Sequence, residues 1–350
     1  MRHDGRVTGT GPDGAALAQL YWRHVVAPLV AARFPGMPCA AGRLGTGSDV
    51  LGLDDATSRD HDWGLRLTLL VPVAAVHPVD AVLEKELPER FGGLPTRFAR
   101  SGEVRPRHQV DVGTVAGFLD ARLGFDPCTA PEVRDWLSLS GQCVLEVVAG
   151  PLFADGPGEI SAARRALEWY PDDVWRYVLA CDWIRLAQEL PLLGRATDVG
   201  DELGARVVAA RLARVVMHLA FLLERRWPPY AKWYGSAFGR LGCAADVGRA
   251  LTATLDARDR HGRQEGIATA LEALLAIQNA HGLSDVDRAT VPFWDRPYLQ
   301  PHPHVVRDLL DAVSDPAVRT LPRGRGSVDQ RTDNVDVLVD PRARRAAVAV

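Results

Sequence analysis

The sequence predicts an α+β protein in which a mixed sheet flanked by helices is followed by an all-helical domain. Roughly the first 120 residues alternate helical apolar periods with short apolar runs that end at glycine or proline, which is typical of mixed α and β structure. From Pro171 onward, apolar residues recur at helical spacing over long stretches. We expect a sheet-containing domain at 1–160, a helical domain at 161–320 and a C-terminal tail at 321–350.

The elements of the first domain follow from apolar periodicity and from the residues that interrupt it. Apolar positions at helical spacing predict an amphipathic helix over 15–34, with Pro28 as a kink or boundary. The same reasoning predicts strands at 38–48, 63–72 and 108–119 and a helix at 78–91. Residues 143–153 predict either another strand or the end of a helix.

The second half of the chain predicts a helical bundle. Ser161 is expected to start a helix, and longer helical periods follow at 172–191, 201–227, 246–260 and 263–282. The polar tail contains the alternating run 334-NVDVLV-339, which predicts an edge strand or a mobile segment.

Composition excludes several classes of protein. The 350 residues are 47% hydrophobic and 24% charged, and the net charge of -3 provides no basic field of the kind that binds polynucleotides. The 5 cysteines are scattered without metal-ligand or disulfide spacing. Neither a signal sequence nor a membrane-spanning apolar run is visible, so we expect a cytoplasmic protein without membrane partners.

The most informative stretch is 45-GTGSDVLGLDDATSRDHDWG-64, where several aspartates precede an apolar run. In a strand, Asp60 and Asp62 would point to the same face, because side chains alternate along a strand. Two nearby carboxylates repel each other unless a cation lies between them, and Mg²⁺ binds such oxygens together with phosphates. The pair predicts half of a metal site, and a cluster of Asx turns at the entrance of a strand is the alternative. The pattern assigns no role to Asp54 or Asp55.

Gly47 and Ser48 precede the aspartate pair in a glycine turn. Glycines between a strand and a short helix let backbone N–H groups face an anion, and the Ser48 hydroxyl can donate to a phosphate oxygen. An ordinary glycine turn is the alternative. Asp111 lies between two valines in a later predicted strand, where it could complete a metal site or accept a proton from an attacking hydroxyl. A solvent-facing aspartate on an edge strand is the alternative there.

This order of motifs resembles the polymerase-β-like nucleotidyltransferase superfamily through Gly47, Ser48, Asp60, Asp62 and Asp111. The stretch GSDVLGLDDATSRDHDWG is also similar to the opening motif of a bacterial family catalogued as domain of unknown function 4037. This second resemblance extends over most of the chain through 136-WLSL, 148-VAGPLFADG, 169-WYPDDVW, 200-GDELGARVVAARL, 230-YAKWYGSAF and 327-SVDQRTDNVDVL.

The resemblance implies a nucleotidyltransferase palm domain followed by a helical domain, and transfer of a nucleoside monophosphate from an NTP with release of pyrophosphate. It implies that Asp60 and Asp62 hold Mg²⁺, or Mn²⁺, and that Gly47 and Ser48 contact the triphosphate. Asp111 would be the third metal ligand or the general base. Two metal ions could stabilise both the attacking and the leaving oxygens of an in-line displacement.

We expect the helical half to supply positive charge for the pyrophosphate. Lys232 is the first candidate, because an ammonium suits phosphate and the neighbouring aromatic residues could stack a base or sugar. A lysine that covers a core of aromatic side chains is the alternative. Arg211 is the second candidate, because it shares one side of its helix with Arg214 and His218, although a solvated face explains those charges as well.

The predicted function is Mg²⁺-dependent nucleotidyl transfer from ATP or another NTP to a hydroxyl, with a small molecule as the favoured acceptor. A protein acceptor, as in an AMPylating transferase, is an alternative, and the net charge makes a nucleic-acid end the least favoured acceptor. A nucleotide-binding regulatory module without turnover is the alternative from another class.

Overall fold

The computed structural model of the chain describes residues 13–55, 57, 63–101 and 104–349, which divide into two compact units. Unit 1 contains Met1–Pro131 and Cys143–Glu168, and unit 2 contains Glu132–Gln142 and Trp169–Val350. These limits differ from the predicted 1–160, 161–320 and 321–350, because the stretch 132–142 leaves the first region for unit 2 and the predicted tail is part of unit 2.

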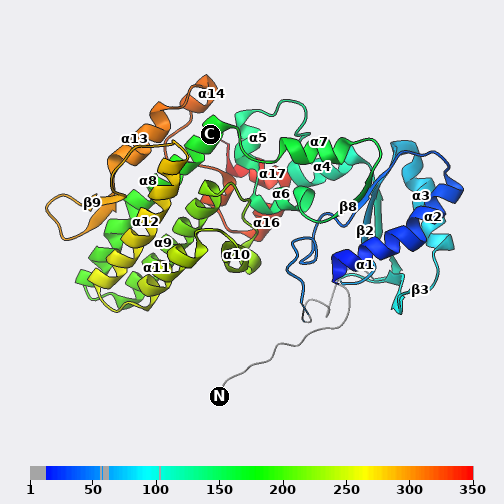
Figure 1. Cartoon of the computed structure of the whole chain (residues 1–350), viewed down its shortest axis with the longest axis horizontal. Helices are drawn as coiled ribbons and strands as arrows, with labels where there is room; N and C mark the ends of the chain where they lie inside the picture. The colour runs from blue at the N-terminus through cyan, green and yellow to red at the C-terminus, as the bar shows by residue number, and fades with distance from the viewer. Residues whose placement is uncertain (1–12, 56, 58–62, 102–103, 350) are drawn as a thin grey trace, which may run out of the picture. The chain divides into compact units, whose positions relative to one another are not determined.

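Unit 1 combines short strands with helices (Figure 1). Its elements, in chain order, are α1 (Gly14–Tyr21), the π-helical turn η1 (Trp22–Val26), α2 (Ala27–Arg33), β1 (Ala40–Gly42), β2 (Leu67–Leu70), the short helix η3 (Val73–Ala75), α3 (Val76–Glu86), β3 (Arg90–Phe91), β4 (Leu94–Pro95), β5 (Arg97–Phe98), β6 (Arg107–His108), β7 (Val110–Gly113), α4 (Val115–Leu123), most of α6 (Gly141–Val148), β8 (Leu152–Asp155) and α7 (Glu159–Ala166).

The main sheet of unit 1 has four strands in the order β7-β2-β1-β8. Strands β2 and β7 are parallel, whereas β1 is antiparallel to both β2 and β8, so the predicted mixed sheet is confirmed. One face of the sheet packs against α1, α2 and α3 through a core that includes Leu67, Leu69 and Val110. Because side chains alternate along a strand, Thr68 and Asp111, which are register partners, face the other side.

The predicted helix over 15–34 is present, with a π-helical turn in its middle. Helix α2 has Pro28 in its first turn, where the missing N–H of proline costs no helical hydrogen bond. The π-helical turn directly precedes it, so the backbone rearranges before Pro28 rather than breaking there.

The predicted strand over 108–119 was too long. Strand β7 ends at Gly113, and the Thr114 side chain accepts a 3.0 Å hydrogen bond from the Gly117 N–H, which caps α4. A threonine at this position satisfies an N–H group that has no partner within the helix, so it favours a helix start over a continued strand.

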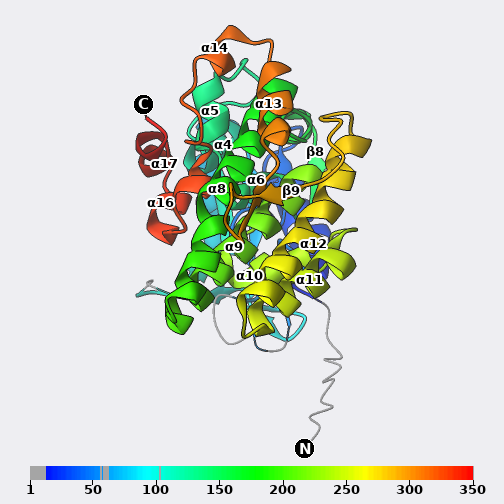
Figure 2. The same cartoon turned by 90° about the vertical axis from the view of Figure 1, so that its left-hand side faces the viewer.

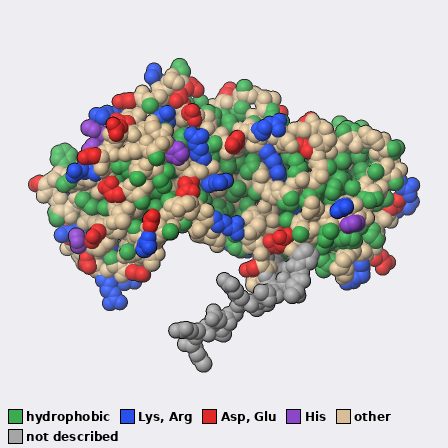
Figure 3. Space-filling model, viewed as in Figure 1, with side chains coloured by type: hydrophobic (Ala, Val, Ile, Leu, Met, Phe, Trp, Pro, Cys, Tyr) green, Lys and Arg blue, Asp and Glu red, His purple; other side chains and the backbone are tan. Residues whose placement is uncertain are grey.

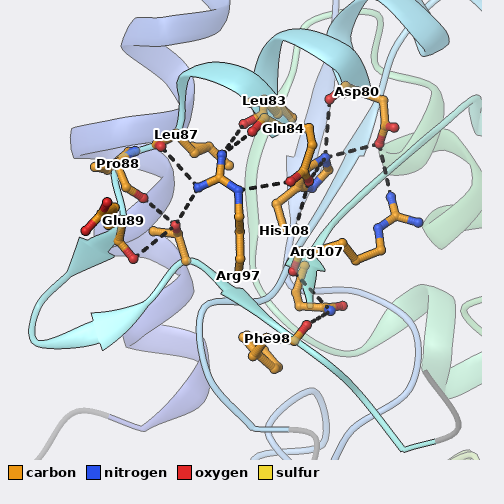
Figure 4. A network of polar contacts seen from close by, with 12 residues as sticks. Asp80, Leu83, Glu84, Leu87, Pro88, Glu89, Arg97, Phe98, Arg107 and His108 are labelled. Carbon is orange, nitrogen blue, oxygen red and sulfur yellow. Dashed lines mark hydrogen bonds and ion pairs between the residues drawn. The ribbon is translucent and has the colours of Figure 1, made fainter. Parts of the chain in front are cut away.

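A polar network joins α3 to the hairpin of β5 and β6 (Figure 4). The Arg97 side chain donates to Glu84 Oε1 at 3.0 Å and to the Leu87 carbonyl oxygen at 3.2 Å. The buried His108 ring lies 3.2 Å from Asp80 Oδ1, and its backbone N–H donates to Glu84 Oε2. Burial raises the pKa of Glu84, but the hydrogen bonds from the His108 backbone N–H and the Arg97 side chain outweigh it and lower the pKa. They hold the chain that leads into β7.

Unit 2 is helical apart from one two-stranded ribbon. Its elements are α5 (Val133–Ser138), α8 (Asp172–Asp198), α9 (Glu202–Leu223), α10 (Ala231–Phe238), α11 (Ala244–Asp256), α12 (Arg260–Ala280), β9 (Thr290–Pro292), β10 (Leu299–Pro301), α13 (Pro303–Asp311), α14 (Pro316–Arg319), α15 (Val328–Arg331), α16 (Val335–Val339) and α17 (Pro341–Ala347). The antiparallel β9–β10 pair corrects the all-helical expectation.

Four long helices, α8, α9, α11 and α12, lie side by side and form the body of unit 2 (Figures 1 and 2). Their buried faces follow the apolar periods of the sequence, with Trp175 and Trp183 among the largest fully buried side chains. Within the described residues, no helix is long and apolar enough to cross a membrane.

The C-terminal stretch folds as short helices. The predicted edge strand over 334–339 is wrong, because Asn334 caps α16 by accepting from the Asp336 N–H. Farther along, the buried Arg344 guanidinium donates to the carbonyl oxygens of Ser138 and Leu338 at 2.9 and 2.8 Å. The end of the chain is therefore hydrogen-bonded to the stretch 132–142, and both belong to unit 2.

An aromatic cluster joins the start of unit 2 to the loop after α9. The ring centroids of Trp169 and Trp227 are 4.9 Å apart, and those of Tyr170 and Trp227 are 4.5 Å apart. Trp136 extends the cluster at 6.2 Å from Tyr170. Tilted pairs at these distances stabilise a fold beyond the area that they bury.

Candidate functional site

The loop after β1 is held by a buried ion pair between Arg43 and Asp49. Arg43 Nε lies 2.6 Å from Asp49 Oδ2, and Arg43 Nη2 lies 2.8 Å from Asp49 Oδ1. The guanidinium also donates to the carbonyl oxygens of Leu44 and Thr46. Because two parallel bonds to a carboxylate fix its geometry, Arg43 sets the backbone of residues 44–49, which include the predicted glycine-serine turn.

Gly47 is required in this turn. Its φ of +141° is rare for other residues, and a Cβ atom there would collide with Asp49 Oδ1 and Arg43 Nη2. Ser48 is half-buried, and its carbonyl oxygen accepts from the N–H groups of Leu51 and Leu53 at 3.2 and 2.9 Å. Residues 48–52 form a turn instead of the predicted short helix, because Gly52 adopts a φ of +61°.

Asp54 has a structural role. Its Oδ2 atom accepts a 2.9 Å hydrogen bond from the Gly14 N–H, at the first residue of α1. A carboxylate is favourable at this position because the N-terminus of a helix carries partial positive charge. The segment ahead of the predicted metal-binding pair is thereby tied to α1.

Asp60 and Asp62 lie outside the described residues, so their predicted roles remain predictions. The described chain resumes at Trp63, and β2 begins at Leu67. Among the described residues, no group of three or more His, Cys, Asp or Glu side chains could hold a metal ion. The described part therefore contributes Asp111 alone to the predicted set of metal ligands.

Asp111 lies on β7 and forms a two-bond ion pair with Arg100. The Arg100 Nη2 and Nη1 atoms lie 2.9 and 3.2 Å from the two carboxylate oxygens. The side chain of Asp111 is 48% exposed and that of Arg100 is 24% exposed, so the carboxylate is open to solvent on one side. Asp111 is thus neither a buried core residue nor an isolated surface acid.

A cavity of about 430 Å³ lies on the face of the sheet that carries Asp111. Besides Asp111 and Thr68, three arginines line it, namely Arg66, Arg100 and Arg122. Its volume is within the range of small-molecule sites. Since three cations surround one acid, the cavity is suited to an anionic ligand.

Burial affects the pKa of Arg66, and neighbouring side chains contact Arg122. Burial lowers the pKa of Arg66 to about 10, assisted by Arg43 and opposed by Asp49 and Asp111, so Arg66 stays cationic near neutral pH. Arg122 Nε lies 3.3 Å from Glu146 Oε2, and its guanidinium lies 5.0 Å from the centre of the Phe118 ring.

The N-terminus of α4 lines the same cavity through Gly113, Thr114 and Gly117. The aligned peptide dipoles of a helix place partial positive charge at this end. The helix start and the arginines therefore act with the same sign on a bound anion.

Lys232 and Arg211 both lie in unit 2 and are not part of the lining of the cavity beside Asp111. Lys232 is exposed in the first turn of α10, with its Nζ atom 5.0 Å from the centre of the Trp233 ring. Arg211 is 57% exposed and pairs with Glu189 at 2.8 Å. Contact of either residue with a nucleotide remains a prediction.

Sequence patterns did not indicate Arg43, Asp49, Arg66, Arg100 or Arg122. The signal that could have indicated Arg66 is its position two residues before Thr68, because this spacing places both side chains on the same face of the strand. The partners of Arg43 and Arg100 depend on how the loop and the sheet fold, and no spacing rule indicates them.

Comparisons with known proteins give one family match. Residues 136–234 match the family described as "Domain of unknown function (DUF4037)". No curated protein matches the chain. A crystal structure of a nucleotidyltransferase-like protein from Exiguobacterium sibiricum 255-15 is similar at 12% identity and a TM-score of 0.32, covering 79% of this chain and 82% of that one. This likeness is too loose to support a functional argument.

The family match contains several motifs on which the resemblance was based, from 136-WLSL to the first five residues of 230-YAKWYGSAF. It includes α8, α9 and the first half of α10. Over residues 136–234, the chain is therefore similar to the family of unknown function 4037 that its sequence motifs indicated.

Proposed function

We propose that the protein is a nucleotidyltransferase that moves a nucleoside monophosphate from an NTP to a hydroxyl group of a small molecule and releases pyrophosphate. The observation that carries the proposal is the cavity of about 430 Å³ in which Asp111 meets three arginines and the N-terminus of α4. The order of motifs from Gly47 to Asp111 supports it independently.

In this proposal the arginines and the start of α4 bind the triphosphate. Arg66, Arg100 and Arg122 come from the entrance of β2, from the segment after β5 and from α4, so they approach the cavity from different elements. Positive charge that is already in place stabilises the charge that develops on the leaving pyrophosphate without reorganisation.

Asp111 is proposed as the group that receives the proton of the attacking hydroxyl, or as a metal ligand. The hydroxyl oxygen forms a bond to the α-phosphorus, the bond from that phosphorus to the bridging oxygen breaks, and pyrophosphate leaves. Mg²⁺ would supply Lewis-acid stabilisation of the phosphoryl oxygens, held by Asp60, Asp62 and Asp111. The two oxygens of Asp111 are engaged by Arg100, so Asp111 must share or exchange that partner in order to serve either role.

The favoured acceptor is a small molecule. Acidic and basic side chains are interspersed on the face of unit 2 that Figure 3 draws, in keeping with the net charge of -3. Extended binding of a polynucleotide requires a row of cations along its phosphates, so interspersed charges of both signs favour a small acceptor.

The test measures pyrophosphate release and NTP binding by the wild-type chain and by Asp111→Asn. We expect the variant to lose at least about a hundredfold in turnover, because it removes a proton acceptor, and to keep NTP binding through the arginines. Asp54→Asn is the matched control, since its side chain can still accept the Gly14 N–H, and it should retain turnover.

Unchanged turnover in Asp111→Asn would contradict the assignment of Asp111. Binding of NTP by the wild type without pyrophosphate release, with every acceptor class tried, would favour a regulatory module. Arg122→Gln should weaken NTP binding by about tenfold, because a hydrogen-bonded charge pair contributes about 1.5–3 kcal/mol.

A further inference from the structure

A second cavity lies wholly within unit 2, among α8, α9, α10 and α15. Its volume is about 30 Å³, which is room for one or two water-sized groups. Its polar lining includes Asp182, Arg185, Arg214, His218, Tyr234 and Asp329. A site of this size accepts one head group of a ligand rather than the whole molecule.

The carboxylate of Asp182 is fully used by its neighbours. Its Oδ2 atom lies 2.6 Å from His218 Nδ1, and its Oδ1 atom accepts a 2.6 Å hydrogen bond from Gln330 Nε2. Gln330 is itself fixed, because its Oε1 atom accepts from the Ser327 N–H at the start of α15. These bonds fix the orientation of the His218 ring.

The other charged groups of the lining, apart from Arg214, also have roles in the fold. Asp329 Oδ2 accepts a 2.7 Å hydrogen bond from the Gly141 N–H, and burial raises the pKa of this carboxyl. Arg185 pairs with Glu189 at 3.2 Å and donates to the Gln330 carbonyl oxygen. Asp333 is exposed at the rim.

Three donor groups of the lining, the Tyr234 hydroxyl, His218 Nε2 and the Arg214 guanidinium, are left over once the contacts among the described residues are assigned. The buried Tyr234 hydroxyl has no hydrogen-bond partner there. His218 is 8% exposed, and only its Nδ1 atom is hydrogen-bonded in the described part of the chain. The Arg214 guanidinium lies 5.3 Å from the centre of the Tyr234 ring, and while burial raises the pKa of Asp329, the charge of Arg214 acts to lower it against that larger effect.

A buried polar group without a partner costs free energy, so the Tyr234 hydroxyl, which lines the same small cavity as Arg214 and His218, calls for an acceptor. We propose that this cavity binds an anionic oxygen group, a carboxylate or a phosphate, of a small-molecule ligand through Arg214, His218 and Tyr234. A planar guanidinium suits both kinds of group. The site lies in unit 2 alone, so the proposal does not depend on nucleotidyl transfer in unit 1.

The charge of His218 agrees with this assignment. Burial lowers the pKa of His218, but Asp182 and Asp329 outweigh it, so the pKa is raised above its ordinary value despite the opposing charge of Arg214. A protonated imidazole donates from both nitrogen atoms, and Nδ1 already serves Asp182. Nε2 can then donate to the ligand.

Most of the cavity lining lies in the matched family segment. All three donors lie within residues 136–234, as do Asp182 and Arg185. The cavity is thus built mainly from the part of the chain that the family model describes.

The test measures binding of inorganic phosphate and of succinate to the full chain by titration calorimetry. We expect Arg214→Gln and Tyr234→Phe to raise the Kd of the bound anion about tenfold or more, because each removes a donor to a charged group. Tyr234→Phe should also leave the melting temperature unchanged or higher, because it removes a hydroxyl without a protein partner among the described residues. If the variants weaken the binding of phosphate alone, the ligand is phosphorylated. If they weaken the binding of succinate alone, the ligand carries a carboxylate.

Two variants serve as matched controls. Arg206→Gln removes an exposed arginine earlier on α9, and Tyr298→Phe removes a hydroxyl that donates to Asp198 elsewhere in unit 2. Both should bind the anion like the wild type, and any anion bound in unit 1 is common to all the proteins compared. Equal Kd values in Arg214→Gln and Arg206→Gln, or no binding of either anion by the wild type, would overturn the proposal. So would binding of methylammonium that is lost in Asp329→Asn and retained in Arg214→Gln.

Discussion

At the scale of single residues, Gly47 shows how one buried ion pair determines which amino acid a turn accepts. We expect Gly47→Ala to lower the free energy of unfolding by about 2–4 kcal/mol, because the methyl group strains the backbone and displaces the Arg43–Asp49 pair. Urea unfolding measures the loss. Gly52→Ala is the control: its φ is +61°, and a Cβ atom there would meet nothing within 4 Å. A loss in Gly47→Ala no greater than that in the control would show that the ion pair tolerates the methyl group.

His218 predicts a pH dependence of stability. Its pKa in the folded protein is raised above the ordinary value of 6.5, so its contribution is fully present below the unfolded pKa and is lost as the pH rises through the folded pKa. We expect the difference in free energy of unfolding between the wild type and His218→Gln to be larger at pH 6 than at pH 9. Unfolding by urea at both pH values measures it, and a difference that is constant or grows with pH would contradict the raised pKa.

The acid of the candidate site, Asp111, could be identified from the sequence, whereas the arginine that pairs with it could not. Asp111 was predicted because a single acid between valines is visible in the sequence, and the structure places it beside a cavity. Arg100 was not predicted, because its pairing with Asp111 depends on the hairpin that the Arg97 network holds against α3. A charged residue in a loop looks the same in sequence whether it is solvated or lines a cavity.

At the scale of elements, Thr114 determines where β7 ends and α4 begins. We expect Thr114→Ala to lower the free energy of unfolding by about 1 kcal/mol, the usual value of an N-cap side chain. Thr252→Ala is the control, because that hydroxyl only bonds back to the Gly248 carbonyl oxygen on an exposed turn of α11. Thermal unfolding compares them, and equal effects would mean that Thr114 contributes no cap.

Long helices were predictable from periodicity, whereas short elements were not. The apolar period of α8 or α9 repeats over many turns and identifies each helix, although the prediction for α8 stopped at Pro191 and the helix continues to Asp198. The run 334-NVDVLV-339 is too short for its alternation to identify a strand, and the cap at Asn334 favours a helical turn. Strand β2 is an exception among the short elements, because it lies in an apolar run that is visible in the sequence.

At the scale of the whole molecule, unit 2 is assembled from stretches that are distant in sequence. Arg344, near the C-terminus, bonds to the backbone of residues 138 and 338. We expect Arg344→Met to lower the free energy of unfolding by about 2 kcal/mol, because the Ser138 carbonyl oxygen loses its donor in a buried setting. Arg342→Met, at an exposed position on the same helix, is the control. Urea unfolding that affects both variants equally would contradict a structural role for the end of the chain.

The domain limits could not be predicted because composition marks the change from mixed to helical structure, not the path of the chain. Glycine and proline cluster near 150–158, but the stretch 132–142 joins unit 2 and 143–168 returns to unit 1. A crossing of this kind arises from long-range contacts such as the Gly141 N–H with Asp329. No local pattern in the sequence specifies those contacts.

The aromatic cluster of Trp136, Trp169, Tyr170 and Trp227 has a spectroscopic consequence. Of the 9 tryptophans, only Trp22 and Trp63 belong to unit 1; the others are Trp136, Trp169, Trp175, Trp183, Trp227, Trp233 and Trp294. Intrinsic fluorescence will therefore report mainly on the helical unit, and its closely packed indole rings should transfer excitation among themselves. Far-ultraviolet circular dichroism reports on both units, so the difference between the two signals during unfolding separates the sheet-containing unit from its helical neighbour.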